Sequence, residues 1–336
     1  MNKIDIQDER DAARRLAASA ETFGKVRAGL NAVIFGQEEV IEQTLITLLA
    51  GGHGLLIGVP GLAKTKLVDT LAVVMGLDTR RVQFTPDLMP ADITGSEVME
   101  ESQSGERAFR FLRGPVFTQL LMADEINRAS PRTQSALLQA MQEKHVTVAG
   151  ARHDLPGLFH VLATQNPLEQ EGTYPLPEAQ LDRFLLQIDV GYPGLEAERR
   201  MLLATTMGEE KAPSQVCVPG DLVEAQALVR RIPVPKPLVR AAVTLVRMTR
   251  PGDAEAPAFV KEFVSWGAGP RASQYLVLAA KARAILQGRY AAAIEDVRAL
   301  AGPVLVHRVL PNFHAEADGV TARALVERLM EAVRPA

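Results

Sequence analysis

The residues with the clearest chemistry lie at positions 58–65, where the sequence reads Gly-Val-Pro-Gly-Leu-Ala-Lys-Thr. This segment matches the phosphate-binding pattern G-x-x-x-x-G-K-[ST], except that Ala63 replaces the second glycine. Successive backbone N–H groups at the start of a helix form a nest for an anion. Lys64 can then place a cation at the β- and γ-phosphates, and the hydroxyl of Thr65 can coordinate Mg²⁺. The segment therefore predicts a site for a nucleotide phosphate chain.

Two alternatives to this interpretation are weaker. A Gly/Pro turn that ends in Lys-Thr by chance would not be expected between an apolar strand and an apolar helix. The Gly-rich stretch Gly52–Ile57 lacks the third glycine of the dinucleotide-binding fingerprint and precedes its strand instead of following it. Ala63 is expected to cost little, because only a glycine at positive φ is irreplaceable.

A pair of acids follows the apolar run Leu120–Ala123. Asp124, at the tip of the expected strand, can hold Mg²⁺ through its waters. Glu125 is expected to point the other way, because side chains alternate along a strand, and can polarise an attacking water. An isolated acidic pair in solvent is the alternative, but the phosphate loop upstream favours the catalytic interpretation.

Another apolar strand ends in Thr164-Gln165-Asn166-Pro167. Ligands of parallel sheets bind at the carboxyl ends of the strands, so Asn166 is expected beside Asp124, where it could orient the water or touch the γ-phosphate. The alternative is an Asn that caps a loop before proline.

Two arginines are candidates for stabilising the transferred phosphoryl group. Arg183 follows a short helix before the last expected strand, and Arg271 begins a helix in the second half of the chain. A guanidinium is permanently charged and planar, which suits this role when a neighbouring subunit or a closing lid supplies it. For each of them, a surface position on a helix is the alternative.

The elements that must position these residues divide the chain in two. Up to about residue 190, apolar β-rich runs alternate with helical stretches, which predicts a parallel sheet covered on both faces. The expected strands are His53–Val59, Arg81–Thr85, Gln119–Asp124, Phe159–Asn166 and Leu185–Val190. After one more helix, Leu195–Thr206, comes a linker at 207–220 and then a helical domain at 221–336, with expected helices at Leu222–Arg230, Pro237–Met248, Arg271–Gln287 and Val320–Val333.

The composition is that of a folded protein. Of 336 residues, 47% are hydrophobic and 23% charged, and the formal net charge of −3 provides no general attraction for nucleic acid or anionic lipid. A single cysteine, Cys217, excludes an intrachain disulfide, and the six histidines show no metal-ligand spacing. No signal peptide or membrane span is apparent, so we expect a cytoplasmic protein.

Taken together, these motifs resemble a MoxR-type AAA+ ATPase of the helix-2-insert clade. The resemblance runs from about Val33 to the Arg271 helix and Ala280–Ala282, and alanine before the loop lysine is usual in that family. The segments that carry it are Gly36–Glu38, Gly51–His53, Gly58–Thr65, Asp124–Ala129, Ala163–Pro167 and Pro177–Phe184. It implies a P-loop AAA+ core with a five-stranded parallel sheet and helices on both faces, a small all-α lid, bound ATP or ADP with Mg²⁺, and a homo-oligomeric ring, commonly a hexamer.

The resemblance also implies roles for individual residues. By it, Asn166 is sensor 1, Arg183 the arginine finger and Arg271 sensor 2, which in relatives with a rearranged lid serves the neighbour's site, so its action in cis or in trans stays open. Glu125 and Lys64 complete the catalytic set, and Thr65 and Asp124 are the metal residues. The expected nucleotide-binding residues are Gly58, Val59, Pro60, Gly61, Leu62, Ala63, Lys64, Thr65, Lys66 and Gln37.

The AAA+ core is expected at 31–206, after an N-terminal helix at 1–30. Two stretches within this core are predicted to form β-hairpins. The first, at about 94–117, contains a polar turn at Glu101–Glu106, and the second spans about 145–157. They resemble the helix-2 insert and the pre-sensor-1 hairpin, which face the central pore or the client in related rings. Surface decoration is the equally weighted alternative.

The sequence thus predicts an ATP hydrolase whose Mg²⁺-dependent turnover drives chaperone-like remodelling or maturation of a protein client. By resemblance, a partner with a von Willebrand factor A domain is expected. A nucleic-acid motor related to minichromosome maintenance helicases would need a basic stripe or a DNA-binding domain, and neither is apparent. An idle nucleotide-dependent scaffold would be expected to lack Glu125, Asn166 or Arg183.

Overall fold

The computed structural model describes residues 6–101, 107–169, 171–207 and 211–332, of which residues 6–12 by their backbone alone. A five-stranded sheet lies at its centre, with the order β2-β5-β8-β1-β9, and every neighbouring pair is parallel. The strands are β1 (Gly54–Ile57), β2 (Thr79–Gln83), β5 (Leu120–Asp124), β8 (His160–Gln165) and β9 (Leu186–Asp189). The predicted five-stranded parallel core is confirmed.

Both faces of the sheet are buried at its centre, because consecutive residues of β1, β5 and β8 enter different cores. On β1, Leu55 packs into one apolar cluster and Leu56 into the other; Leu121 and Leu120 on β5 are divided in the same way. The cluster that holds Leu56 and Leu120 is built with α1 (Ile6–Asn31), α2 (Glu38–Leu49) and α3 (Lys64–Met75), and it continues without a break into the C-terminal helices. The other cluster packs against α5 (Pro131–Glu143).

The helical lid follows α7 (Leu195–Thr206) and a stretch without helix or strand in its described part. Besides its helices, the lid contains a short antiparallel pair, β10 with β11, which is too brief to produce a visible alternation in the sequence. Pro303 lies inside α12, and this helix was not among those expected. The lid elements are α8 (Pro219–Arg231), α9 (Lys236–Met248), α10 (Ala258–Phe263), β10 (Val264–Trp266), α11 (Pro270–Leu286), α12 (Ile294–Leu305), β11 (Leu310–Pro311), α13 (Phe313–Ala317) and α14 (Ala322–Ala332).

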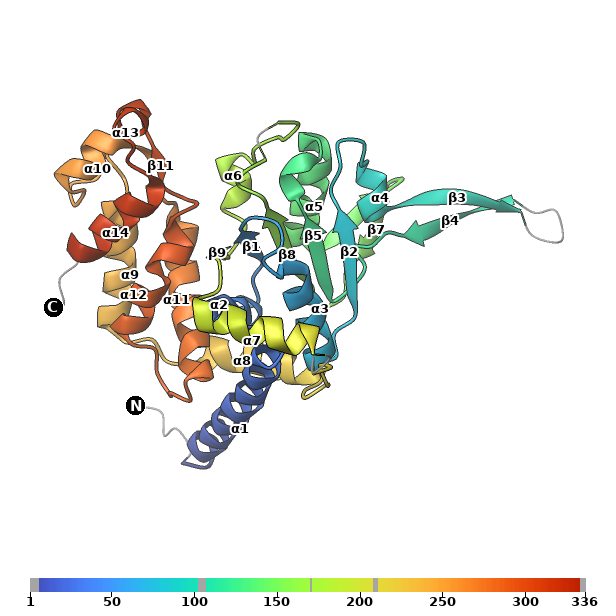
Figure 1. Cartoon of the computed structure of the whole chain (residues 1–336), viewed down its shortest axis with the longest axis horizontal. Coiled ribbons are helices and arrows are strands. Elements are labelled where there is room, and N and C mark those ends of the chain that lie inside the picture. Colours follow the sequence, from blue (N-terminus) through green and yellow to red (C-terminus); the bar gives the residue numbers. More distant parts are fainter. Residues whose placement is uncertain (1–5, 102–106, 170, 208–210, 333–336) are drawn as a thin grey trace.

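Two antiparallel hairpins interrupt the α/β part. After the short helix α4 (Pro90–Thr94), β3 (Gly95–Glu101) pairs with β4 (Arg107–Arg113), and this hairpin projects from the sheet on the side away from the lid (Figure 1). The turn expected at Glu101–Glu106 lies outside the described residues except for Glu101. The second hairpin, β6 (His145–Val148) with β7 (Ala151–Asp154), follows α5. No helix in the described ranges is both long and apolar enough to cross a lipid bilayer.

Candidate nucleotide-binding site

The phosphate loop connects β1 to α3, at the carboxyl end of a central strand. Gly61 adopts φ +83°, a left-handed conformation that glycine tolerates, and α3 begins at Lys64. Ala63 also lies in the left-handed region, with φ +57°. The expectation that Ala63 costs little was therefore wrong in its premise, because this position does need positive φ, and an L-residue pays about 1–2 kcal/mol there.

Lys64 turns back onto its own loop. Its ammonium donates to the carbonyl oxygen of Gly58 and, at 3.2 Å, to that of Val59. Burial lowers the pKa of Lys64, while the carboxylates of Asp124 and Glu125 oppose this shift. The ammonium is thus hydrogen-bonded to the loop carbonyl oxygens and interacts with the carboxylates of Asp124 and Glu125.

The acidic pair is arranged differently from the expected alternation. Asp124 is the last residue of β5 and is 8% exposed, whereas Glu125 follows the strand with φ +56° and leaves the sheet by this left-handed turn. The hydroxyl of Thr164 fixes both residues, since it donates to Asp124 Oδ1 at 2.5 Å and accepts from the backbone N–H of Glu125 at 2.8 Å. Backbone turning, and not strand alternation, separates the two carboxylates.

One cavity of about 400 Å³ brings the predicted catalytic residues together. Lys64 and Thr65 enter from the loop, Asp124 and Glu125 from the end of β5, and Asn166 from the end of β8. Asn166 is 4% exposed, and its Oδ1 accepts from the backbone N–H of Leu168 at 3.1 Å, so the amide nitrogen is the group left for the cavity. Asn166 therefore caps the loop and lines the site at once. The other residues of the wall are Pro60, Gly61, Leu62, Ala63, Lys66 and Thr164.

The site also holds polar partners that the sequence did not reveal. From β2, Arg81 forms an ion pair with Asp124 at 2.5 Å, and Gln83 donates to Glu125 Oε2 at 2.6 Å. Arg128, three residues after Glu125, donates to the same Oε2 at 2.9 Å. Both carboxylates are therefore held by neighbouring cations or amides in this conformation. The parallel pairing of β2 with β5, which places Gln83 opposite Asp124, is what brings the β2 residues here.

A second, more apolar cavity of about 290 Å³ shares the loop wall with the first. Val33, Ile34 and Phe35 form one side, and Tyr192, Pro193 and Met201 form another. Gln37 lies in this wall, and its side-chain nitrogen donates to the carbonyl oxygen of Gly191 at 2.8 Å. The predicted residues Pro60 to Ala63 and Lys66 border both cavities, whereas Gly58 and Val59 lie in neither wall. A nucleotide has a flat base next to a charged phosphate chain, so it needs an apolar cavity beside a polar one.

The residues present fit Mg²⁺. This cation takes oxygen ligands and is usually bound through one or two protein groups, with phosphate oxygens and water as the other ligands. The hydroxyl of Thr65 and the carboxylate of Asp124 line the same cavity and are donors of this kind.

Arg183 and Arg271 do not line either of these two cavities. Both line a third cavity, of about 200 Å³, together with Gly51, Gly52 and His53, which precede β1, whereas the phosphate loop follows β1. Burial and then the positive charge of Arg271 lower the pKa of Arg183. The structure thus brings the two predicted arginines together, but at the opposite end of the strand from Lys64.

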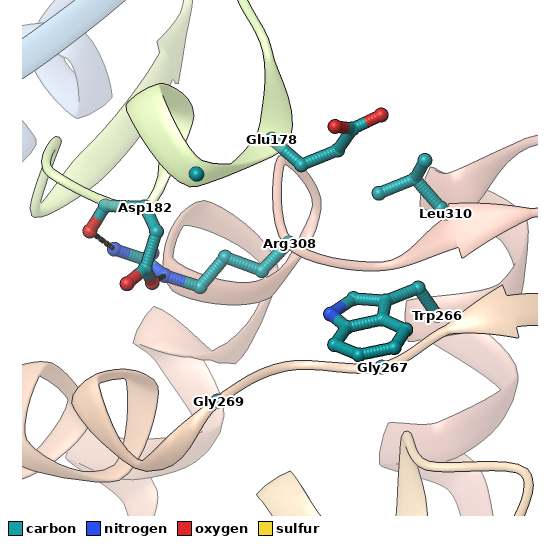
Figure 2. Close-up of a pocket in the computed structure, with 8 residues that line it drawn as sticks. Glu178, Asp182, Trp266, Gly267, Gly269, Arg308 and Leu310 are labelled. Atoms are coloured by element: carbon teal, nitrogen blue, oxygen red, sulfur yellow. Dashed lines mark hydrogen bonds and ion pairs between the residues drawn. The ribbon is translucent and has the colours of Figure 1, made fainter.

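Asp182 connects these arginines to the lid. It forms ion pairs with Arg271 at 2.9 Å and with Arg308 at 2.8 Å. Arg308 is 4% exposed and also donates to the carbonyl oxygens of Asp182 and Phe184. Figure 2 shows Arg308 reaching Asp182 from the lid, with Trp266 and Leu310 on the other side of the pocket between the two parts. The segment α6 (Glu178–Leu181), which precedes Asp182 and Arg183, is therefore tied to the lid by charge.

A parallel sheet with a phosphate loop, two strand-end acids and a helical lid defines an AAA+ ATPase. In agreement, the chain matches the family model "ATPase family associated with various cellular activities (AAA)" at residues 53–186 and the AAA lid domain at residues 257–329.

Comparison with similar proteins identifies the family within the AAA+ ATPases. The chain is 41% identical to "Chaperone MoxR1" of Mycobacterium tuberculosis, over 96% of this chain and 84% of that protein, and 32% identical to "Protein MoxR" of Paracoccus denitrificans, over 92% and 94%. A crystal structure from Cytophaga hutchinsonii, of a protein to which ATPase activity is ascribed, superposes with a TM-score of 0.89 at 36% identity, over 97% of this chain and 98% of that one. The chain belongs to the MoxR family of AAA+ ATPases.

Proposed function

We propose that this protein binds ATP with Mg²⁺ and hydrolyses it to ADP and phosphate, in a ring in which adjacent copies complete each active site. The observation that carries the proposal is the single cavity in which Lys64, Thr65, Asp124, Glu125 and Asn166 meet. The apolar cavity on the other side of the loop would take the base and sugar.

Each residue of the cavity has a distinct task in this proposal. Lys64 leaves the carbonyl oxygens of Gly58 and Val59 and binds the outer phosphates. Glu125 accepts a proton from the attacking water, and the amide nitrogen of Asn166 orients that water or the γ-phosphate. Thr65 and Asp124 would hold Mg²⁺, which when bound would neutralise charge on the phosphates. To accept this proton, Glu125 must release its contacts with Arg128 and Gln83 and contact the attacking water instead.

The position of Arg183 and Arg271 supports their action in trans. A strand of four residues, β1, separates their cavity from the phosphate loop, which is about 13 Å at 3.3 Å per residue. A neighbouring copy could instead present its phosphates to these arginines. A ring, and by family resemblance a hexamer, is the assembly in which every copy gives and receives such a contact.

Glu125→Gln tests the catalytic assignment. The variant should bind ATP as tightly as the wild type but hydrolyse it at least about 10²-fold more slowly, because a positioned base is lost while Lys64 and Thr65 remain. Glu327→Gln, an exposed change on α14, is the control and should leave both properties unchanged. Lys64→Ala should weaken binding itself. A Glu125→Gln protein that turns over ATP within a few fold of the wild type would show that the base is wrongly assigned.

Mixing two inactive variants tests the shared site. Arg183→Ala should bind ATP normally and turn over about 10³-fold more slowly or worse. When it is mixed with Lys64→Ala, some interfaces join an intact phosphate loop to an intact Arg183, so activity should return. Co-assembly of the two variants with no recovered turnover would contradict action in trans.

We further propose that hydrolysis remodels a protein client and that the β3–β4 hairpin contacts it. Met99 and Phe109 are opposite each other in the hairpin register and are 58% and 73% exposed. By resemblance, a protein with a von Willebrand factor A domain is the candidate partner. Glu125→Gln loaded with ATP should retain such a domain in a pull-down, and a further Met99→Ser, Phe109→Ser change should release it. Equal retention by both proteins would exclude the hairpin as the contact.

A further inference from the structure

The third cavity is more positively charged than the two arginines of its wall account for. Lys144 and Arg183 enter it from the α/β part, and Arg230 and Arg271 enter it from the lid. No Asp or Glu belongs to this wall. Among the four, Arg271 has an ion-pair partner, Asp182, while Lys144, Arg183 and Arg230 form no ion pair with any described residue. Burial and Arg271 lower the pKa of Arg183, and the negative charge of Glu143 opposes this shift. Four like charges around one space favour an anion there.

Two elements far apart in sequence supply the additional cations. Lys144 is the C-cap residue that follows α5, and Arg230 lies in the last turn of α8, where Lys281 donates to its backbone carbonyl oxygen at 2.9 Å. This contact anchors the backbone of Arg230 to α11, the helix that carries Arg271. The two lid arginines are therefore held on elements that are bonded to each other.

Lys144 has an unusual backbone conformation. Its φ is +54°, one of four such values at non-glycine positions in the described ranges. Glycine or asparagine is the usual residue where a helix ends in this conformation. A lysine is sterically more costly than glycine at this position, so replacement by glycine can remove the charge without adding backbone strain.

The volume of the cavity restricts the anion. At about 200 Å³, it is smaller than the roughly 300–1,000 Å³ typical of sites that enclose a whole small-molecule ligand. It can accept the end of a phosphate chain whose remaining atoms are held elsewhere. The phosphate loop of the same chain is a strand length away, so a second molecule must hold the rest.

We propose that this cavity receives the terminal phosphates of a nucleotide bound by an adjacent copy, and that Lys144 and Arg230 contact those phosphates alongside Arg183 and Arg271. This inference rests on the proposed function and extends it by two residues. The cavity then contains one core cation and one lid cation beyond the two predicted arginines. Its charge is matched by a polyphosphate and not by a single carboxylate.

The test compares Lys144→Gly and Arg230→Gln with matched controls. Ala149→Gly removes positive-φ strain at another site without a change of charge, and Arg231→Gln removes the neighbouring arginine, which does not line the cavity. Each test variant should lower kcat at least tenfold in assembled protein, with the Kd for ATP unchanged because its own phosphate loop is intact. Lys144→Gly should keep or raise the melting temperature, and Arg230→Lys should recover part of the activity. Both controls should turn over like the wild type.

Mixing experiments show where the lost charge acts. Lys144→Gly mixed with Lys64→Ala should regain turnover, because the Lys64→Ala copies still carry the complete cationic cavity. If Lys144→Gly and Arg230→Gln hydrolyse ATP within twofold of the wild type while Arg183→Ala does not, this inference is wrong and the proposed function stands. If the wild type itself does not hydrolyse ATP, the proposed function is wrong, and the inference falls with it.

A final arm separates an adjacent nucleotide from a free polyphosphate. Inorganic tripolyphosphate is titrated into Lys64→Ala at a protein concentration at which it is monomeric, with and without Lys144→Gly. No binding that depends on Lys144 is expected. Saturable binding that Lys144→Gly abolishes would show an independent polyphosphate site and overturn the assignment to a neighbouring copy.

Discussion

Acidification should destabilise this protein through two buried histidines at the start of β1 and β8. The backbone N–H of Val161 donates to Nδ1 of His53 at 3.0 Å, so that nitrogen must be unprotonated. His160 contacts the carbonyl oxygen of Gly52 at 2.8 Å through Nδ1 and the side-chain nitrogen of Gln226 at 3.0 Å through Nε2. A carbonyl requires a donor and the amide nitrogen requires an acceptor, so His160 is neutral as well.

The pKa values give the size of the effect. Burial lowers the pKa of His53 to about 3 and that of His160 to about 4. In the unfolded chain both titrate near 6.5, so below that pH the unfolded state binds more protons and the free energy of unfolding falls. Each histidine contributes a slope of about 1.4 kcal/mol per pH unit, which is about 2 kcal/mol between pH 7 and pH 5. The pKa of His307 is also lowered, chiefly by burial, and acts in the same direction.

Urea unfolding of wild type and His160→Gln at pH 7 and pH 5 measures this effect. Glutamine can donate to Gly52 and accept from Gln226 but does not titrate, so the loss of stability between the two pH values should shrink by about 2 kcal/mol. His314→Gln, an exposed change on α13, should leave the loss as it is in the wild type. The depressed pKa of Asp296 acts at lower pH, because the stability that it confers is lost only as pH falls through its folded pKa. An unchanged pH dependence in His160→Gln would refute the assignment of a buried neutral imidazole.

Three further predictions concern single positions. Ala63→Gly should raise the free energy of unfolding by about 1 kcal/mol in urea titrations, because it relieves the left-handed strain at φ +57°; a loss of stability would contradict this. Asp182→Asn should lower the free energy of unfolding by about 2–3 kcal/mol, because the buried Arg308 loses its counter-charge. Asp189→Asn, in the exposed pair with Arg323, should lower it by less than about 1 kcal/mol. Equal losses in urea titrations would show that the Asp182 pairs are unimportant. Gly95→Ala should lower the melting temperature and raise protease cleavage of the β3–β4 hairpin, because its Cβ would lie 2.2 Å from the carbonyl oxygen of Leu112; an unaltered digestion pattern would refute it.

The sequence predicts those parts of the site that depend on local pattern. A buried strand followed by a loop, an acid pair or an amide has a recognisable signature, so the sequence alone predicts Lys64, Asp124 and Asn166 at the same edge of the sheet, and these residues line one cavity. The same reasoning could not find Arg81 or Gln83. They reach the acids only because β2 pairs with β5, and a single sequence does not reveal which strands are neighbours.

Backbone conformation and long-range charge were also hidden. The residue type at position 63 does not disclose its positive φ, and at Glu125 a left-handed turn replaces the expected alternation. Lys144 and Arg230 are 86 residues apart, since 230 − 144 = 86, and they share a cavity only after the lid has packed onto the core. A charge cluster of this kind is a property of tertiary structure, and no spacing in the sequence predicts it.

The double ion pair of Asp182 has a consequence for how a ring of these chains would behave. Arg271 from α11 and Arg308 after α12 both bind Asp182, so the lid is tied by charge to the residue that precedes Arg183. If each copy offers Arg183 to one neighbour and receives a different neighbour's arginine at its own phosphate loop, the two directions around the ring are not equivalent. A movement of one lid would then affect the active site of one neighbouring copy and not that of the other. Coupling between neighbouring sites would then have a fixed direction around the ring.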